Sequence, residues 1–224
     1  MISDIGLESG IRLNIGCGLS PTPGWLNFDN SPSVRMARWP VLSPVLAGLG
    51  LLRGPSAKLG AITQRADIRF ANAADHIPCP AGCSSAVYSS HMIEHLDRAE
   101  ARSFLAEVMR VLQPGGVVRL AVPDLSMLVR AYLGDGDADR FVAGTRMGLD
   151  RPCGLRAWAK WTLVGPRHHL WMYDGESLAT MLSEAGFADA AAVPPGSTRI
   201  PEPGQLDLRE RAAESVYVEA IRPR

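Results

Sequence analysis

The sequence predicts an α/β domain with a mostly parallel sheet, and three observations support this prediction. The chain has 224 residues, within the range of one domain, and 46% of them are hydrophobic. Short apolar runs alternate with helical patterns, as expected where helices connect parallel strands. A Gly-Cys-Gly turn follows the first apolar run, at the position where open α/β sheets hold ligands. We expect residues 1–224 to form one domain, with an apolar insert at about 33–60 and an acceptor-side excursion at about 135–173.

Seven segments have the length and composition of strands. The fifth is β-branched and apolar enough to lie at the centre of the sheet. The predicted strands are Ile11–Ile15, Trp25–Phe28, Thr63–Ile68, Ser84–Ser89, Val117–Val122, Phe187–Val193 and Ser215–Ile221.

Three helices are predicted from their periodicity and their ends. Asp97–Leu112 carries apolar residues at helical spacing, and Pro114-Gly115-Gly116 stops it. A second helix is expected after Pro123-Asp124, and Asp174–Ala185 begins with an aspartate suited to an N-cap. Pro194–Gln205 is rich in proline and glycine, which predicts a loop or an exposed excursion.

Charge and cysteine content exclude several classes of protein. Lys+Arg and Asp+Glu each number 23, so the chain lacks the basic excess of a typical nucleic-acid binder. Its 4 cysteines are too few for a stapled secreted scaffold, and we expect reduced thiols in a cytoplasmic protein. Cys79 and Cys83 could be half of a zinc site, but no second Cys/His pair follows at suitable spacing.

Neither a signal peptide nor a membrane-spanning segment is expected. The N-terminus carries Asp4 and Glu8 and has no basic region. The most apolar stretch, Val41–Leu52, is about a dozen residues long, whereas a bilayer span needs about 20. The apolar insert leaves three roles open: a lid, a contact between two copies of the chain, or a contact with a membrane surface.

Three strand ends carry candidate ligand-binding residues. In Asn14-Ile15-Gly16-Cys17-Gly18, the glycines let the backbone turn sharply and leave room for a ligand on it. Asp29 ends the next strand, where a carboxylate can accept hydrogen bonds from both ribose hydroxyls of an adenosine. Asp67, with Ile68, ends the third predicted strand and could accept from an adenine amine. A plain turn, an N-capping aspartate and a surface aspartate explain the same residues without a ligand.

Four of the 5 histidines fall in two segments. The first is His91-x-x-Glu94-His95, where the fourth strand becomes a loop, and the second is His168-His169. If both segments face one pocket, these histidines supply a general base or metal ligands. His-x-x-Glu-His also occurs in zinc proteases, but there it needs a long helix that is not expected here. Ordinary hydrogen bonds at a helix start and in a polar loop are the structural alternative.

With these motifs in order, the sequence resembles the class I S-adenosylmethionine-dependent methyltransferases. It is similar in particular to a small bacterial branch that begins Leu-Asn-x-Gly-Cys-Gly, has Gly-Trp-x-Asn-x-Asp in its second strand, and is often associated with surface-polysaccharide synthesis. The resemblance covers most of the chain. The matching segments are Leu13–Gly18, Gly24–Asp29, Ser90–Leu96, Val111–Gly116, His169–Asp174 and Leu182–Phe187.

The resemblance implies a fold, a cofactor and a set of contacts. The fold is a Rossmann-like, doubly wound sheet with strand order 3-2-1-4-5-7-6 and an antiparallel last strand, and the cofactor is S-adenosylmethionine. The implied contacts are Asn14, Gly16, Cys17 and Gly18 with the methionine part, Asp29 with the ribose, Asp67 and Ile68 with the adenine, and Ser89, Ser90 and His91 with both the cofactor and the acceptor.

Two departures from the family pattern bear on the cofactor. Family members usually carry an acid at the end of the first strand, whereas Asn14 can hydrogen-bond but cannot neutralise the cofactor's ammonium group. About eight residues join the first two strands, although a parallel crossover normally needs a dozen or more. The first helix is therefore expected to be a stub or an extended loop.

We expect methyl transfer to a hydroxyl of a saccharide or another small molecule. The methyl group of a sulfonium is already activated, so the protein mainly positions donor and acceptor, while His91, His95, His168 or His169 assists as a base. Two alternatives stay open. One is metal-assisted methylation of RNA ribose, because some relatives carry Glu-x-x-Glu-His at this position. The other is a cofactor-binding or scaffold protein without turnover. No resident metal is expected.

Overall fold

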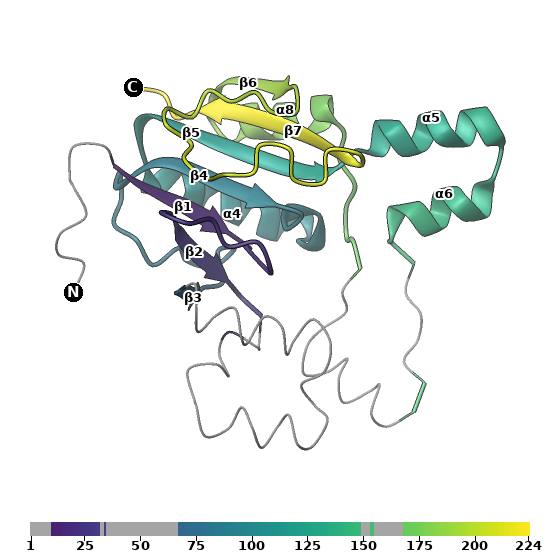
Figure 1. Ribbon diagram of the computed structural model, residues 1–224, viewed down its shortest axis with the longest axis horizontal. Coiled ribbons are helices and arrows are strands. Elements are labelled where there is room, and N and C mark those ends of the chain that lie inside the picture. Colours follow the sequence, from purple (N-terminus) through teal and green to yellow (C-terminus); the bar gives the residue numbers. More distant parts are fainter. Residues whose placement is uncertain (1–9, 32–33, 35–66, 149–152, 155–167) are drawn as a thin grey trace.

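A computed structural model describes residues 10–31, 34, 67–148, 153–154 and 168–224. Apart from Val34, the predicted insert at about 33–60 lies outside the described residues, as does most of 149–167. Within the described part, strands form one sheet in the order β3-β2-β1-β4-β5-β7-β6, as predicted (Figure 1). The strands are β1 Ile11–Ile15, β2 Leu26–Asp29, β3 Ile68–Phe70, β4 Ser84–Ser90, β5 Leu112–Pro123, β6 Ala188–Val193 and β7 Ser215–Ile221.

Strand directions also agree with the prediction. β1 is parallel to both β2 and β4, and the parallel pairing continues to β3 on one side and β5 on the other. β7 runs antiparallel to both of its neighbours, β5 and β6. The carboxyl ends of β1 to β5 therefore share one edge of the sheet, which is where ligands bind in such folds.

The described helices begin and end at recognisable signals. They are the short 3₁₀ helix η1 Ile93–His95 and the α-helices α4 Arg98–Val111, α5 Leu125–Asp135, α6 Ala138–Thr145 and α8 Gly175–Glu184. Asp97 caps α4, and its side chain accepts from Ala99 N and Glu100 N. Asp174 caps α8, as the sequence predicted. α5 and α6 extend from the sheet as a helical hairpin (Figure 1). Of the described helices, none is long and apolar enough to cross a membrane.

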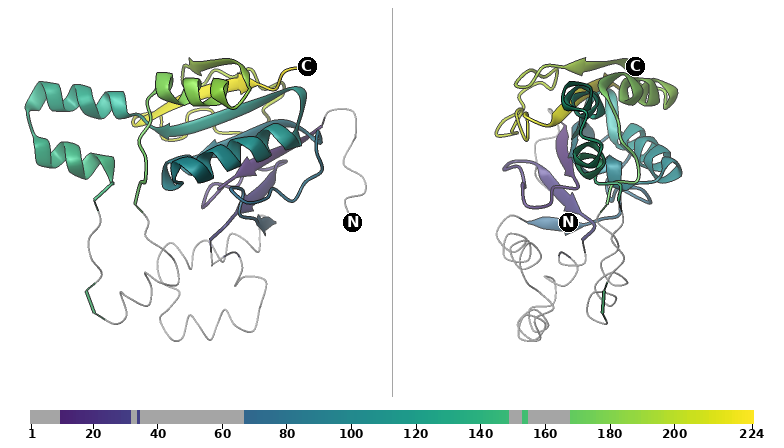
Figure 2. Two further views of the ribbon diagram at one scale, coloured as in Figure 1. Left: turned by 180° about the vertical axis from the view of Figure 1, so that it is seen from behind. Right: turned by 90° about the vertical axis from the view of Figure 1, so that its right-hand side faces the viewer.

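The two faces of the sheet are covered differently. α4 and α8 lie on the same face, where Phe104 and Leu178 join one apolar core with the inward side chains of the strands (Figure 2). Residues 194–214, which we call the 194–214 segment, cover the opposite face. Ile200 and Leu206 of this segment pack with Trp25, Tyr88 and Tyr217. Helices on both faces were expected, but the described part has none on this second face. The link between β1 and β2 is too short for a helix there.

A buried ion pair fixes the 194–214 segment to the sheet. Arg119 of β5 and Glu219 of β7 are cross-strand partners with fully buried side chains, and Arg119 Nη1 is 2.7 Å from Glu219 Oε1. Arg119 also donates to the carbonyl oxygens of Ser197 and Leu208, at 2.8 and 3.1 Å. Glu219 accepts from Thr198 Oγ1 at 2.6 Å and from Arg199 N at 2.8 Å. We call Arg119, Glu219, Thr198 and Arg199 the Arg119–Glu219 cluster.

The third strand differs from the prediction. It covers Ile68–Phe70, whereas Thr63–Ile68 was expected, and residues 63–66 lie outside the described part. Asp67 therefore precedes β3 instead of ending it, and its positive φ of 47° is a turn conformation. Pairing of Phe70 with Asp29 places the carboxyl end of β3 at Phe70.

Candidate functional site

The glycine turn after β1 is held by the second strand. Gly16 N and Cys17 N donate to Phe28 O at 2.8 and 3.0 Å, and Gly18 N donates to Asp29 Oδ2 at 3.0 Å. Gly16 and Gly18 have φ values of 70° and 50°, a region that favours glycine. The turn thus places Asp29 directly beside Gly18 at the carboxyl edge of the sheet.

Asp29 is positioned by main-chain donors and keeps capacity to accept more hydrogen bonds. It is only 8% exposed, and its Oδ1 accepts from Ser31 N at 2.7 Å. An ionised carboxylate has about four acceptor positions, so the bonds from Gly18 and Ser31 leave others free for ligand hydroxyls. This geometry suits the predicted ribose contact, which stays a prediction.

The end of β4 carries a buried hydroxyl beside the glycine turn. Ser89 Oγ is buried and has no hydrogen-bond partner among the described residues. A Cβ added to Gly16 would lie 3.9 Å from Ser89 Oγ and 2.6 Å from Met92 Cγ, so only glycine allows this close approach. Buried hydroxyls normally have a partner, and Ser89 therefore suits a polar ligand group lying over the turn.

Asn14 has a structural role that its position in the sequence did not reveal. Its side chain is buried, and Nδ2 lies 3.2, 3.1 and 3.2 Å from Ser20 O, Thr22 Oγ1 and Asn27 Oδ1. These contacts hold the link between β1 and β2 in place, and this link contains no helix. Its predicted contact with the cofactor stays a prediction.

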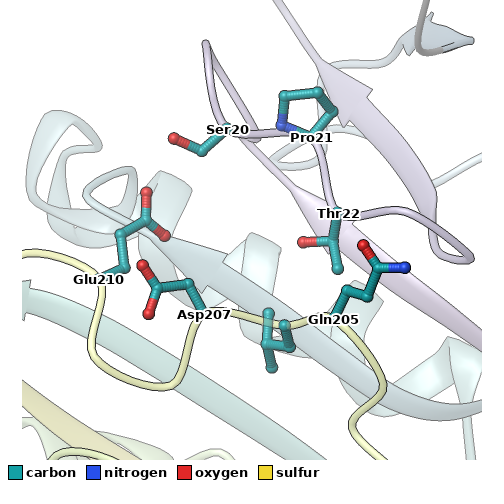
Figure 3. A pocket seen from close by; sticks show the side chains of 7 residues that line it. Ser20, Pro21, Thr22, Gln205, Asp207 and Glu210 are labelled. Atoms are coloured by element: carbon teal, nitrogen blue, oxygen red, sulfur yellow. The ribbon is translucent and has the colours of Figure 1, made fainter.

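A pocket of about 150 Å³ opens between the β1–β2 link and the 194–214 segment (Figure 3). Asp207 and Glu210 line it, and Glu210 Oε2 accepts from Tyr88 OH at 2.8 Å. Burial, followed by the negative charges of Asp29 and Glu210, raises the pKa of the Cys17 thiol. The pocket is therefore acidic and lies within electrostatic reach of the glycine turn. Its lining residues are Ser20, Pro21, Thr22, Gln205, Leu206, Asp207 and Glu210.

The two residues predicted to contact the adenine, Asp67 and Ile68, have different surroundings in the structure. Ile68 packs with Cys17 and Val34 in a small apolar cluster, beside the glycine turn. Asp67 is exposed, pairs with Arg69 at 3.2 Å, and lies at the amino end of β3. Its expected place at the carboxyl end of the strand was wrong, because the strand begins one residue after it. Asn72 follows β3 at the carboxyl edge, and sequence reasoning missed it.

The two histidine segments meet around Glu94. Leu170 N and Trp171 N donate to Glu94 O at 2.7 and 3.2 Å, and His95 Nδ1 lies 2.9 Å from His168 O. The rings of His95 and His169 are 5.0 Å apart, edge to face. We call His91, Glu94, His95, His168 and His169 the histidine cluster. The sequence motif contained Glu94, but only the structure shows that His91, His95 and His169 lie close to it and that His168 adjoins His95.

His91 lies between a carboxylate and a hydroxyl. Its Nδ1 is 3.4 Å from Glu94 Oε1, and its Nε2 is 2.8 Å from Ser215 Oγ. A positive φ of 49° turns the chain at His91, and its N–H donates to Ala121 O at 2.9 Å. A carboxylate at Nδ1 favours a proton there and leaves Nε2 free to accept one. Ser215 was predicted only as the first residue of a strand.

Glu94 also lies close to His95 and His169. His169 is 3% exposed, with Nδ1 3.3 Å from Met172 Sδ. Burial lowers the pKa of His169, and the negative charge of Glu94 opposes this effect. Glu94, His95 and His169 each offer one potential ligand atom, and these three atoms lie within 4.8 Å of one another.

The strand order, the glycine turn after β1 and the buried acid at the end of β2 are features of a Rossmann-like fold. A family model described as a methyltransferase domain matches residues 24–192, and the chain belongs to this family. The protein is thus an S-adenosylmethionine-dependent methyltransferase, as the sequence led us to expect. No curated protein sequence matches the chain.

Solved structures show the same fold at low sequence identity. A SAM-dependent methyltransferase from Methanosarcina mazei has a TM-score of 0.53 at 13% identity, over 96% of this chain and 93% of that one. A protein of Haloferax volcanii, solved in complex with the Trm112 methyltransferase activator, has a TM-score of 0.51 at 16% identity, over 98% and 84%. A methyltransferase from Mesorhizobium loti has a TM-score of 0.50 at 15% identity, over 98% and 94%.

Proposed function

We propose that the protein methylates a hydroxyl group of a saccharide or another small molecule, with His91 as the general base. The observation that carries the proposal is the buried Glu94–His91 pair, with Nδ1 and Oε1 3.4 Å apart, at the end of β4. The same strand end holds the unpartnered Ser89 Oγ beside Gly16. A base at this point adjoins the region expected to hold the cofactor's reacting end.

The residues at the carboxyl edge fit S-adenosylmethionine. Asp29 would accept from the ribose hydroxyls, and Ser89 would border the methionine part. Ile68 and Asn72 would flank the adenine, in place of Asp67. Glu210 would supply the negative charge that Asn14 cannot give to the cofactor's ammonium group, since its charge already acts on Cys17 in the glycine turn.

Bound S-adenosylmethionine supplies an activated methyl group on a sulfonium. The protein's own part is to hold the acceptor and remove the proton from its hydroxyl group. His91 Nε2 would take this proton, and Glu94 would stabilise the resulting imidazolium. Ser215 Oγ, 2.8 Å from Nε2, occupies a position that an acceptor hydroxyl would take over.

Charge and thiol chemistry support a small acceptor and a cytoplasmic location. With 23 basic and 23 acidic residues, the chain has no overall charge to attract a nucleic acid. All four cysteines carry free thiols, as in a reducing compartment. A second copy of the chain is a further partner that we propose, through the apolar insert.

The base is tested by replacing His91 with glutamine and following S-adenosylhomocysteine release with a panel of monosaccharides, nucleotide sugars and total RNA. We expect turnover with a sugar, and a loss of about 10²- to 10⁴-fold in H91Q, because a positioned base contributes that much. H76Q is the matched control, since His76 is exposed and pairs with Glu107. Turnover of H91Q within about threefold of the wild type would refute the base. Methylation of RNA alone would refute the acceptor class.

A further inference from the structure

Glu94 is a buried carboxylate without a matching partner. Its side chain is 1% exposed, and neither oxygen accepts a hydrogen bond from a described residue. Its ion-pair partner among the described residues is His91, whose charge depends on protonation. Burying a carboxylate without compensation is costly, and an unpartnered buried polar group often marks a missing water or ion.

Two further histidines lie close to the same carboxylate. Glu94 and His95 come from η1, and His169 comes from a segment far along the chain, yet one potential ligand atom from each lies within 4.8 Å of the others. The segments are tied together by the hydrogen bonds from Leu170 N and Trp171 N to Glu94 O. Of the described residues, no other set of at least three His, Cys, Asp or Glu residues gathers in this way.

We propose that Glu94, His95 and His169 bind a divalent transition-metal cation, with Zn²⁺ as the best-fitting ion. Two imidazoles and one carboxylate are ligands that zinc accepts in sites with an open fourth position. Ligands about 2.1 Å from a tetrahedral ion lie about 3.4 Å apart, so atoms that are within 4.8 Å of one another need to close by at most about 1.4 Å. His95 is exposed, and a rotation of its side chain would contribute to this closure.

The cation would compensate the buried charge of Glu94, in place of the role towards a protonated His91 that is proposed above. Its open position would then receive the acceptor oxygen, a role that rests on the proposed function, whereas the binding itself does not. The sequence analysis expected no resident metal, but it left open that the two histidine segments supply metal ligands if they face one pocket. The structure brings His169 of the second segment close to Glu94 and His95 of the first.

Metal titration of the full chain tests the site without any acceptor. Protein stripped with EDTA is titrated with Zn²⁺ by calorimetry, and with Co²⁺ for the visible spectrum of its coordination sphere. We expect one ion per chain with a Kd of about 1 µM or lower. E94Q and H169A should each weaken binding by about tenfold or more. Glutamine has nearly the same shape as glutamate, so E94Q keeps the test valid if H169A does not fold.

Two controls separate this site from other zinc ligands. H76A removes an exposed histidine, and C83S removes a thiol within hydrogen-bond reach of Cys79. Both should bind Zn²⁺ within about threefold of the wild type. Absence of binding at about 100 µM Zn²⁺, or binding lost in C83S but kept in E94Q, would overturn the site. S-adenosylhomocysteine is titrated in parallel, so that failure of the metal site is distinguished from failure of the methyltransferase function.

Discussion

Glu219 and Glu94 are both fully buried glutamates, but their surroundings differ. Glu219 receives hydrogen bonds from Arg119, Thr198 and Arg199, and both of its carboxylate oxygens have partners. Glu94 receives none from the described residues, and His91 approaches it no closer than 3.4 Å. Both carboxylates lie in a low-dielectric interior, where charges need compensation.

The difference separates a structural cluster from a functional one. The Arg119–Glu219 cluster joins the 194–214 segment to the sheet, and its hydrogen bonds are nearly complete within the chain. The histidine cluster lies at the carboxyl edge of the sheet and leaves several polar atoms without partners. Unsatisfied buried groups persist where a ligand, ion or reaction supplies the missing interaction. Matched substitutions in the two clusters should therefore act on different properties of the protein.

Replacing Glu219 with glutamine should have the largest effect on stability. It leaves the buried Arg119 guanidinium without its counter-charge, and breaking a buried ion pair from one side costs about 3–5 kcal/mol. Urea denaturation should report this loss in the free energy of unfolding. The double variant R119M/E219L removes both charges and should recover part of it. An E219Q protein as stable as the wild type would show that the cluster does not hold the 194–214 segment in place.

Replacing Asn14 with aspartate should destabilise the protein, although it restores the acid that is usual in the family. Asn14 Nδ2 faces three oxygen atoms, and a carboxylate oxygen in its place would lose the hydrogen bonds to the carbonyl oxygens of Ser20 and Asn27, which only accept, and keep at most one with the Thr22 hydroxyl. We expect a loss of about 2–3 kcal/mol, as for a buried group left unsatisfied. The thermal midpoint and urea titration measure it. Unchanged stability together with tighter cofactor binding would assign Asn14 to the cofactor instead.

Replacing Glu94 with glutamine should have the smallest effect on stability. No hydrogen bond to a described residue is lost, and removal of a buried charge offsets the weak contact with His91. In EDTA we expect the free energy of unfolding to change by less than about 1 kcal/mol, towards higher stability. In Zn²⁺ the wild type should gain stability and E94Q should not. A loss of unfolding free energy comparable to that of E219Q would show that Glu94 has a structural role, as Glu219 does.

The sequence predicted the sheet well because each of its long strands combines apolar content with a clear start or stop. Asp174 was also found, since an aspartate before an apolar helical pattern is a strong cap signal. The third strand was misplaced because it has only Ile68–Phe70, too few residues for a periodicity. The 194–214 segment has no periodicity at all, so its role as the cover of one sheet face could not be predicted.

The candidate site was predicted in part. Spacing within each segment pointed to the histidines, but His95 and His168 are 73 residues apart, and only tertiary contacts bring them together. Asn14 was assigned by its position at the end of a strand, whereas its contacts with Ser20, Thr22 and Asn27 arise from the short link to β2 and from β2 itself. Such contacts depend on the path of the chain, which local patterns do not specify.

Titration of S-adenosylhomocysteine into the wild type, D29A and E94Q tests the central claim most directly, because it separates the cofactor side of the site from the acceptor side. We expect the wild type and E94Q to bind with a similar Kd, in the range of about 1–100 µM. D29A should bind at least about tenfold more weakly, because the ribose would lose its acceptor. Absence of binding to the wild type, or equal binding to D29A, would contradict the account.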